Sequence, residues 1–134
     1  MLNLTGKTAA VLGAGRSGRA AARLAEHCGA RVTIYDSRQA EETVLADPEI
    51  GLEVNADLVV VSPGIETNGD FVQSFAKGSG ALWGEIELAW RCYSGKTIGI
   101  TGTNGKTTTT ELVRDLVEAT GKSCVACGNY GVPL

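Results

Sequence analysis

Residues 8–36 read TAAVLGAGRSGRAAARLAEHCGARVTIYD, and this stretch predicts a strand, a helix and a second strand in succession. The run 8–12 is short and apolar, as in a strand buried on both faces, and it ends at a glycine. Alanine, leucine and cysteine at four-residue spacing indicate a helix over 16–28, and Gly29 ends it. The β-branched run 31–35 is the second strand. Because a helical crossover joins them, the two strands are expected to be parallel.

The rest of the chain continues this alternation. Further strands are predicted over 57–61, 81–83, 96–101 and 122–126. Further helices are predicted over 41–45, 71–77, 85–93 and 107–120, with Asp47-Pro48 ending the first of them. Strands that alternate with helices predict the α/β class: a doubly wound, Rossmann-like parallel sheet with flanking helices.

Composition limits the kind of protein. The 134 residues carry a net charge of −3, and 43% are hydrophobic against 20% charged, which is typical of a globular chain. The mild acidic balance argues against a general nucleic-acid or membrane-surface binder, which needs a basic patch. No apolar run approaches the roughly 20 residues of a membrane span, and no signal peptide is visible. We therefore expect a cytoplasmic protein with neither nucleic acid nor membrane as partner.

A GxGxxG motif, formed by Gly13, Gly15 and Gly18, lies between the first strand and the first helix. Its glycines permit a tight turn and let the backbone approach an anion at the positive helix N-terminus. Asp36 follows the second strand, where a carboxylate accepts hydrogen bonds from a ribose or a base. Read alone, this motif predicts the dinucleotide-binding (NAD or FAD) domain of an oxidoreductase.

A second glycine-rich loop, ITGTNGKTT, occupies residues 100–108. It departs from GxxxxGK[ST] because Ile100 stands where the first glycine belongs, but it keeps the strand before it and the helix after it. Lys106 is placed to reach the β- and γ-phosphates of ATP, and Thr107 offers a hydroxyl to Mg²⁺. Since an oxidoreductase needs no ATP loop and a simple ATPase needs no dinucleotide-like domain, the pairing of the two loops is informative.

The four cysteines are expected to be reduced thiols, because no export signal is present. The spacing Cys124-x-x-Cys127 permits a redox or metal pair. We favour two small apolar residues in a strand, because a closed zinc site takes four ligands and the chain offers no second CxxC.

Together, several stretches resemble the Mur ligase family over nearly the whole chain: GAGRSG with Asp36, the turn SPGI at 62–65, GEIEL at 84–88, ITGTNGKTTTTELV at 100–113 and GNYG at 128–131. The resemblance implies that the first domain holds a UDP-sugar rather than NAD. The UDP-sugar-binding residues it implies are Gly13, Gly15, Arg16, Ser17, Gly18, Asp36, Ser37, Ser62, Pro63, Gly64 and Asn129. The ATP-binding residues it implies are Gly102, Thr103, Asn104, Gly105, Lys106, Thr107 and Thr108, with Lys106 and Thr107 catalytic and Thr107 a Mg²⁺ ligand.

The implied activity is an ATP-dependent amide ligation in peptidoglycan precursor synthesis, and hence in cell wall biogenesis, cell shape and cell division. The resemblance favours the members that join D-glutamate to UDP-N-acetylmuramoyl-L-alanine. The alanyl carboxylate takes the γ-phosphoryl group of ATP, and the D-glutamate amine attacks the acyl phosphate. These two substrates, with ATP and Mg²⁺, are the implied partners of a monomer.

Two domains are predicted: a Rossmann-like UDP-sugar-binding domain over 1–93, and the incomplete start of an ATP-binding central domain over 94–134. The second segment offers one strand, the P-loop, one helix and one further strand, near the limit of about 40 residues below which a domain rarely stands alone. We expect it to be docked or loosely packed, and the 134-residue chain alone to be inactive. A stand-alone nucleotide-binding module remains an alternative, as does the oxidoreductase domain.

The stretch 36–62 is shorter than the family pattern. Glu85 and Glu87 are expected to be surface or capping residues at the start of a helix.

Overall fold

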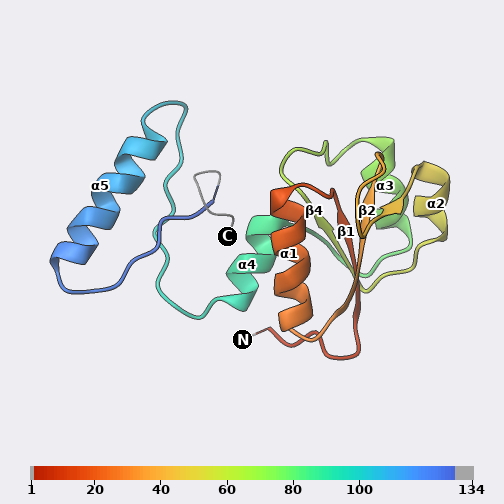
Figure 1. The fold of residues 1–134 in the computed structure, drawn as a ribbon, viewed down its shortest axis with the longest axis horizontal. Coiled ribbons are helices and arrows are strands. Elements are labelled where there is room, and N and C mark those ends of the chain that lie inside the picture. Colours follow the sequence, from red (N-terminus) through yellow and green to blue (C-terminus); the bar gives the residue numbers. More distant parts are fainter. Residues whose placement is uncertain (1, 129–134) are drawn as a thin grey trace. The chain divides into compact units, whose positions relative to one another are not determined.

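The computed structural model describes residues 2–128, and within them the chain forms two compact units, one ending at Ser94 and one beginning at Gly95. The first unit holds a five-stranded parallel sheet in the order β3-β2-β1-β4-β5. Its strands β4, β1 and β2 are labelled in Figure 1. Its strands are β1 (Thr8–Leu12), β2 (Arg31–Asp36), β3 (Val44–Leu45), β4 (Leu58–Val61) and β5 (Leu82–Gly84). Its helices are α1 (Arg16–His27), α2 (Pro48–Glu53), α3 (Asp70–Lys77) and α4 (Glu85–Cys92). The predicted Rossmann-like sheet with flanking helices is confirmed.

The central strands β1 and β4 are buried on both faces, which explains their uninterrupted apolar sequences. Val11 and Val60 face one cluster, in which residues of α1 and α4 pack. Leu12 and Val59 face the other, which contains Phe75 of α3. With both faces covered, the ends of the strands are the places left for a binding site.

The helix predicted over 41–45 is wrong. Val44–Leu45 form the short strand β3, and the helix of this region is α2, which begins at Pro48. Asp47 caps it, because its Oδ1 accepts a hydrogen bond from the backbone N–H of Ile50 at 2.9 Å. Proline has no N–H to lose in the first turn of a helix, so Asp47-Pro48 begins a helix here rather than ending one.

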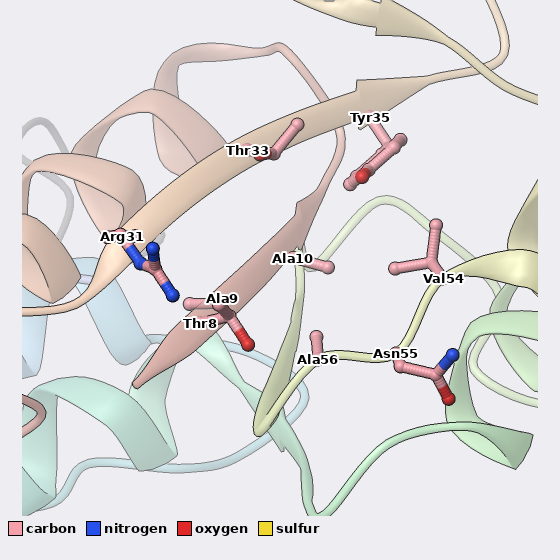
Figure 2. Close-up of a pocket in the computed structure, with 9 residues that line it drawn as sticks. All are labelled: Thr8, Ala9, Ala10, Arg31, Thr33, Tyr35, Val54, Asn55 and Ala56. Carbon is pink, nitrogen blue, oxygen red and sulfur yellow. The ribbon is translucent and has the colours of Figure 1, made fainter. Parts of the chain in front are cut away.

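No helix joins β2 to β3. A short connection suffices because β3 pairs only with Tyr35 and Asp36, at the carboxyl end of β2, so the chain need not return to the amino end. Beside the amino-terminal part of β2 lies a hollow of about 170 Å³, shown in Figure 2. Arg31 and Thr33 border it together with residues 54–56, and none of the predicted site residues does.

Asp57 joins the start of β4 to the start of β1. Its Oδ1 accepts a hydrogen bond from Lys7 Nζ at 2.8 Å, and its Oδ2 accepts one from the backbone N–H of Thr8 at 2.8 Å and one from the Thr8 hydroxyl at 3.1 Å. The bonds from Lys7 and Thr8 lower the pKa of Asp57 to about 2. Its carboxylate therefore favours the folded state wherever it is ionised.

We expect Asp57→Asn to remove part of the acid sensitivity of the fold. Because the folded pKa of Asp57 lies below the unfolded one, its contribution is complete above about pH 4 and is lost as the pH falls toward about 2. The midpoint of urea unfolding should therefore fall less over this interval in Asp57→Asn than in the wild type. Glu66→Gln, at an exposed carboxyl of the same unit, is the control. An unchanged acid response in Asp57→Asn would contradict the assignment.

The second unit contains the helix α5 (Lys106–Ala119), and the helix predicted over 107–120 is thus confirmed. The strands predicted over 96–101 and 122–126 are not formed; both segments are irregular. A strand needs a hydrogen-bonded neighbour, and residues 95–128 supply no sheet for either segment to join. No residue of α5 is buried, and Leu112 and Leu116 are 58% and 61% exposed.

Candidate functional site

The first glycine loop lies at the carboxyl edge of the parallel sheet, where the strand order reverses. From β1 the sheet continues to β2 on one side and to β4 on the other. Gly13 follows β1, Ser62 follows β4 and Glu85 follows β5, so all three are at this edge. In open α/β sheets, ligands bind in the crevice outside the carboxyl ends of the strands at such a switch point.

The three glycines of the motif have different tasks. Gly13 has a φ of +105°, and a Cβ added at Gly18 would lie 1.9 Å from the Gly13 carbonyl oxygen. These two glycines therefore allow the turn and the close contact of α1 with the strand end. A Cβ at Gly15 would meet nothing within 4 Å. Only at Gly15 does the missing side chain leave open space beside the loop, where a ligand can approach the backbone.

The N-terminus of α1 has the features of an anion-binding site. Gly15 caps it without a side-chain hydrogen bond, and no acidic residue stands in its first turn. Among the helices that the structure describes, only α5 shares both features. The helices α2, α3 and α4 each have a carboxylate at this end, from Asp47, Asp70 and Glu85 respectively. The two helices that follow glycine-rich loops are thus the ones in which neither a capping side chain nor an acidic residue of the first turn compensates the N–H groups and the positive end of the helix dipole.

Asp36 holds the loop in place. Its Oδ2 accepts a hydrogen bond from the backbone N–H of Ala14 at 2.7 Å, and its Oδ1 accepts one from the backbone N–H of Arg38 at 2.9 Å. Both carboxylate oxygens are therefore already engaged by the chain, a task that the sequence motif did not predict. The neighbouring Ser37 is exposed.

The turn at Ser62 and Pro63 lines a pocket of about 290 Å³, together with Ile65, Trp83 and Glu85. Gly64 is exposed within the same turn. In the part of the chain that the structure describes, two buried side-chain oxygens have no hydrogen-bond partner, and both belong to residues of this pocket: Ser62 Oγ and Glu85 Oε2. The walls are otherwise largely apolar, as is usual for small-molecule sites.

Glu85 was expected to be a surface or capping residue at the start of a helix. It does stand in the first turn of α4, but it makes no side-chain capping hydrogen bond and does not lie at the surface. The residue is only 6% exposed, whereas Glu87 forms a 2.7 Å ion pair with Arg91 on the outside of α4. The signal was present in the sequence, because Glu85 has the helical spacing of the buried Leu88 and Cys92. A carboxylate at that spacing lies on the buried face.

The second loop is an exposed turn closed by its own lysine. Gly102 and Gly105 have φ values of +145° and +77°, a region that favours glycine. Lys106 Nζ donates to the carbonyl oxygens of Gly102 and Thr103. To reach a phosphate, the ammonium group has to leave these carbonyls.

The remaining candidates of this loop, Asn104, Thr107 and Thr108, are exposed. The residues described contain no group of three or more His, Cys, Asp or Glu side chains placed so that they could hold a metal ion. The role of Thr107 toward Mg²⁺ stays a prediction, as do the roles of all the site residues. Asn129 lies outside the described residues, and Arg16 and Ser17 lie in the first turn of α1.

The cysteines do not add a site. Cys28 and Cys92 are buried with their Sγ atoms 3.0 Å apart, and burial, together with the Cys28 thiol, raises the pKa of Cys92 to about 12. A thiol of such high pKa is a poor nucleophile at neutral pH. Cys124 and Cys127 are half-buried in an irregular segment, not in the strand that was expected.

Comparison with known proteins gives relatives along the whole chain. The chain is 40% identical to the UDP-N-acetylmuramoylalanine–D-glutamate ligase of Desulfitobacterium hafniense (strain DSM 10664 / DCB-2), over 99% of this chain and 32% of the relative. The enzymes of the same name from Acidobacterium capsulatum and Lachnoclostridium phytofermentans are 39% and 35% identical, over 99% and 98% of this chain and 32% of each relative. Residues 100–133 match the Mur ligase middle domain.

The resemblance to the Mur ligase family is confirmed. The chain spans about a third of the length of the curated ligases it matches. The aligned stretch, 146 positions in the first of them, exceeds the 134 residues of the chain, so the chain has gaps relative to that ligase.

Residues 1–62 match a second family, the NAD binding domain of D-isomer specific 2-hydroxyacid dehydrogenases. This match covers the first glycine loop and ends before the second. A shikimate dehydrogenase from Aquifex aeolicus aligns with 72% of this chain and 52% of its own, at 17% identity and a TM-score of 0.43. At this low identity and TM-score, the similarity adds no information about the fold beyond the order of the strands. In the described part of the chain, no helix is both long and apolar enough to cross a membrane.

Proposed function

We propose that this chain is the N-terminal part of a ligase that joins D-glutamate to UDP-N-acetylmuramoyl-L-alanine at the cost of ATP. The observation that carries the proposal is the pair of glycine loops, each leading into a helix whose N-terminus has neither a side-chain cap nor an acidic residue in its first turn. The ligases to which the chain is 35–40% identical support the choice of substrates. The protein is proposed to act as a monomer in the cytoplasm.

In this proposal the first unit binds the sugar nucleotide. The diphosphate lies at the open side of Gly15, where the free N–H groups at the start of α1 donate to it. Arg16 and Ser17 stand beside it, and the uridine lies toward Asp36 and Ser37 at the end of β2. Ser62, Pro63 and Gly64 form the opposite wall.

The loop 102–108 is proposed to bind the phosphates of ATP, with Lys106 between the β- and γ-phosphates and Thr107 on Mg²⁺. The γ-phosphoryl group passes to the alanyl carboxylate, and the amine of D-glutamate then attacks the acyl phosphate and releases phosphate. Lys106 offsets charge on the transferring group. We expect binding rather than turnover from these 134 residues alone.

The second candidate is an NAD-binding domain, which the match of residues 1–62 favours. An NAD-binding domain gives no role to the second glycine-rich loop, residues 100–108.

The proposal is tested by thermal unfolding of the chain with UDP-N-acetylmuramoyl-L-alanine or NADH. A ligand that binds only the folded state stabilises it by about 2.7 kcal/mol at a hundredfold excess over Kd. We expect the sugar nucleotide to raise the melting temperature and NADH to leave it unchanged. The reverse result would assign the first loop to a dinucleotide and overturn the proposal.

A further inference from the structure

Glu85 is a buried carboxylate that the fold leaves unsatisfied. The residue is 94% buried, and its Oε2 has no hydrogen-bond partner among the described residues. A buried polar group without a partner costs folding free energy, so such a group is rare unless something outside the protein completes it. Glu85 borders the pocket of Ser62 and Trp83, which is open enough to admit a ligand.

The sheet order tells which part of a ligand reaches Glu85. The glycine loop follows β1; Asp36 follows β2 on one side of it, and Glu85 follows β5 on the other, beyond β4. A sugar nucleotide whose diphosphate lies at the loop and whose nucleoside lies toward Asp36 must extend its other half toward β4 and β5. That half is the sugar, so the pocket beside Glu85 faces the sugar and not the uridine.

We propose that Glu85 accepts a hydrogen bond from the sugar half of the bound nucleotide and thereby selects it. This inference rests on the proposed function. A carboxylate accepts hydrogen bonds, so the group it recognises is a donor: a pyranose hydroxyl or the N–H of an acetamido substituent. Pro63, Ile65 and Trp83 supply an apolar wall against which the rest of the sugar ring packs.

The test compares two ligands on two variants of the full 134-residue chain by titration calorimetry. The ligands are UDP, which lacks the sugar, and UDP-N-acetylmuramoyl-L-alanine. Glu85→Gln keeps the size of the side chain but puts an amide in place of the carboxylate. Glu87→Gln makes the same change two residues along the same helix, where Glu87 contacts Arg91 at the surface and lies outside the pocket.

We expect Glu85→Gln to weaken the binding of UDP-N-acetylmuramoyl-L-alanine about tenfold, the size of a hydrogen bond to a charged group, and to leave the binding of UDP as in the wild type. Glu87→Gln should bind both ligands like the wild type. Should Glu85→Gln fail to fold, Glu85→Asp keeps the charge, draws the carboxylate back by one methylene and is expected to show the same selective loss.

Three results would overturn the inference. Unchanged binding of the sugar nucleotide by Glu85→Gln would show that the carboxylate makes no contact with it, while the proposed function stands. An equal loss for both ligands would place Glu85 at the nucleotide half. A wild-type chain that binds neither ligand would refute the sugar-nucleotide site itself, and the inference with it.

Discussion

Gly18→Ala should destabilise the first unit by about 3 kcal/mol or more, because the added methyl group would lie 1.9 Å from the carbonyl oxygen of Gly13 and 2.8 Å from Ser62 Oγ. The Gly13 carbonyl cannot give way easily, because it belongs to the backbone. The helix α1 would have to move off the strand end. The measurement is the free energy of unfolding in urea, followed by circular dichroism.

Gly15→Ala is the matched control. Its φ of −68° suits any residue, and its Cβ would meet nothing within 4 Å, so the fold should be as stable as the wild type or slightly more so. The same methyl group occupies the open side of the loop, so Gly15→Ala should nevertheless weaken the binding of UDP-N-acetylmuramoyl-L-alanine. Equal stability of the two variants would contradict the close contact of α1 with Gly13.

Lys106→Ala should weaken the binding of ATP about a hundredfold and leave the binding of the sugar nucleotide unchanged. The loss of the ammonium group from two phosphate contacts corresponds to about a hundredfold in Kd for Mg²⁺-ATP. Binding of UDP-N-acetylmuramoyl-L-alanine should not change, because the two loops belong to separate units. Calorimetric titration with each ligand measures both effects.

Lys96→Ala removes an exposed lysine of the same unit outside the loop, and it should bind both ligands like the wild type. If Lys106→Ala lost both ligands together, the separation into two sites would be wrong. If the wild-type chain bound no ATP, the ATP half of the proposed function would fail for this chain.

The part of the fold that the sequence predicts best is the part that local patterns decide. The strand, helix and strand from β1 to β2 follow from an apolar run, a helical spacing and a glycine that ends α1. The region after Asp36 was harder, because a two-residue strand such as β3 carries no periodicity and is formed only through its pairing with β2. The strands expected over 96–101 and 122–126 have strand-like composition, but composition cannot form a strand without a neighbour.

For the site, the two glycine-rich motifs located both loops but did not predict the roles of the individual residues. That Asp36 binds the backbone of Ala14 and Arg38, and that Gly18 contacts Gly13, depends on the tertiary approach of elements. Glu85 was misjudged because its position at the start of a helix favoured a capping role. Its burial is decided by the packing of α4 on the sheet through Leu88 and Cys92.

The most direct test of the central claim, that the first glycine loop holds a sugar nucleotide, is to follow the amide resonances of the chain by NMR as UDP-N-acetylmuramoyl-L-alanine is added. The account predicts the largest shifts at residues 15–17, with further shifts at Ser62, Gly64, Ile65 and residues 84–86. Unshifted resonances at residues 15–17 would contradict it, as would shifts centred on the hollow beside Thr33 and Asn55 or the same response to NADH.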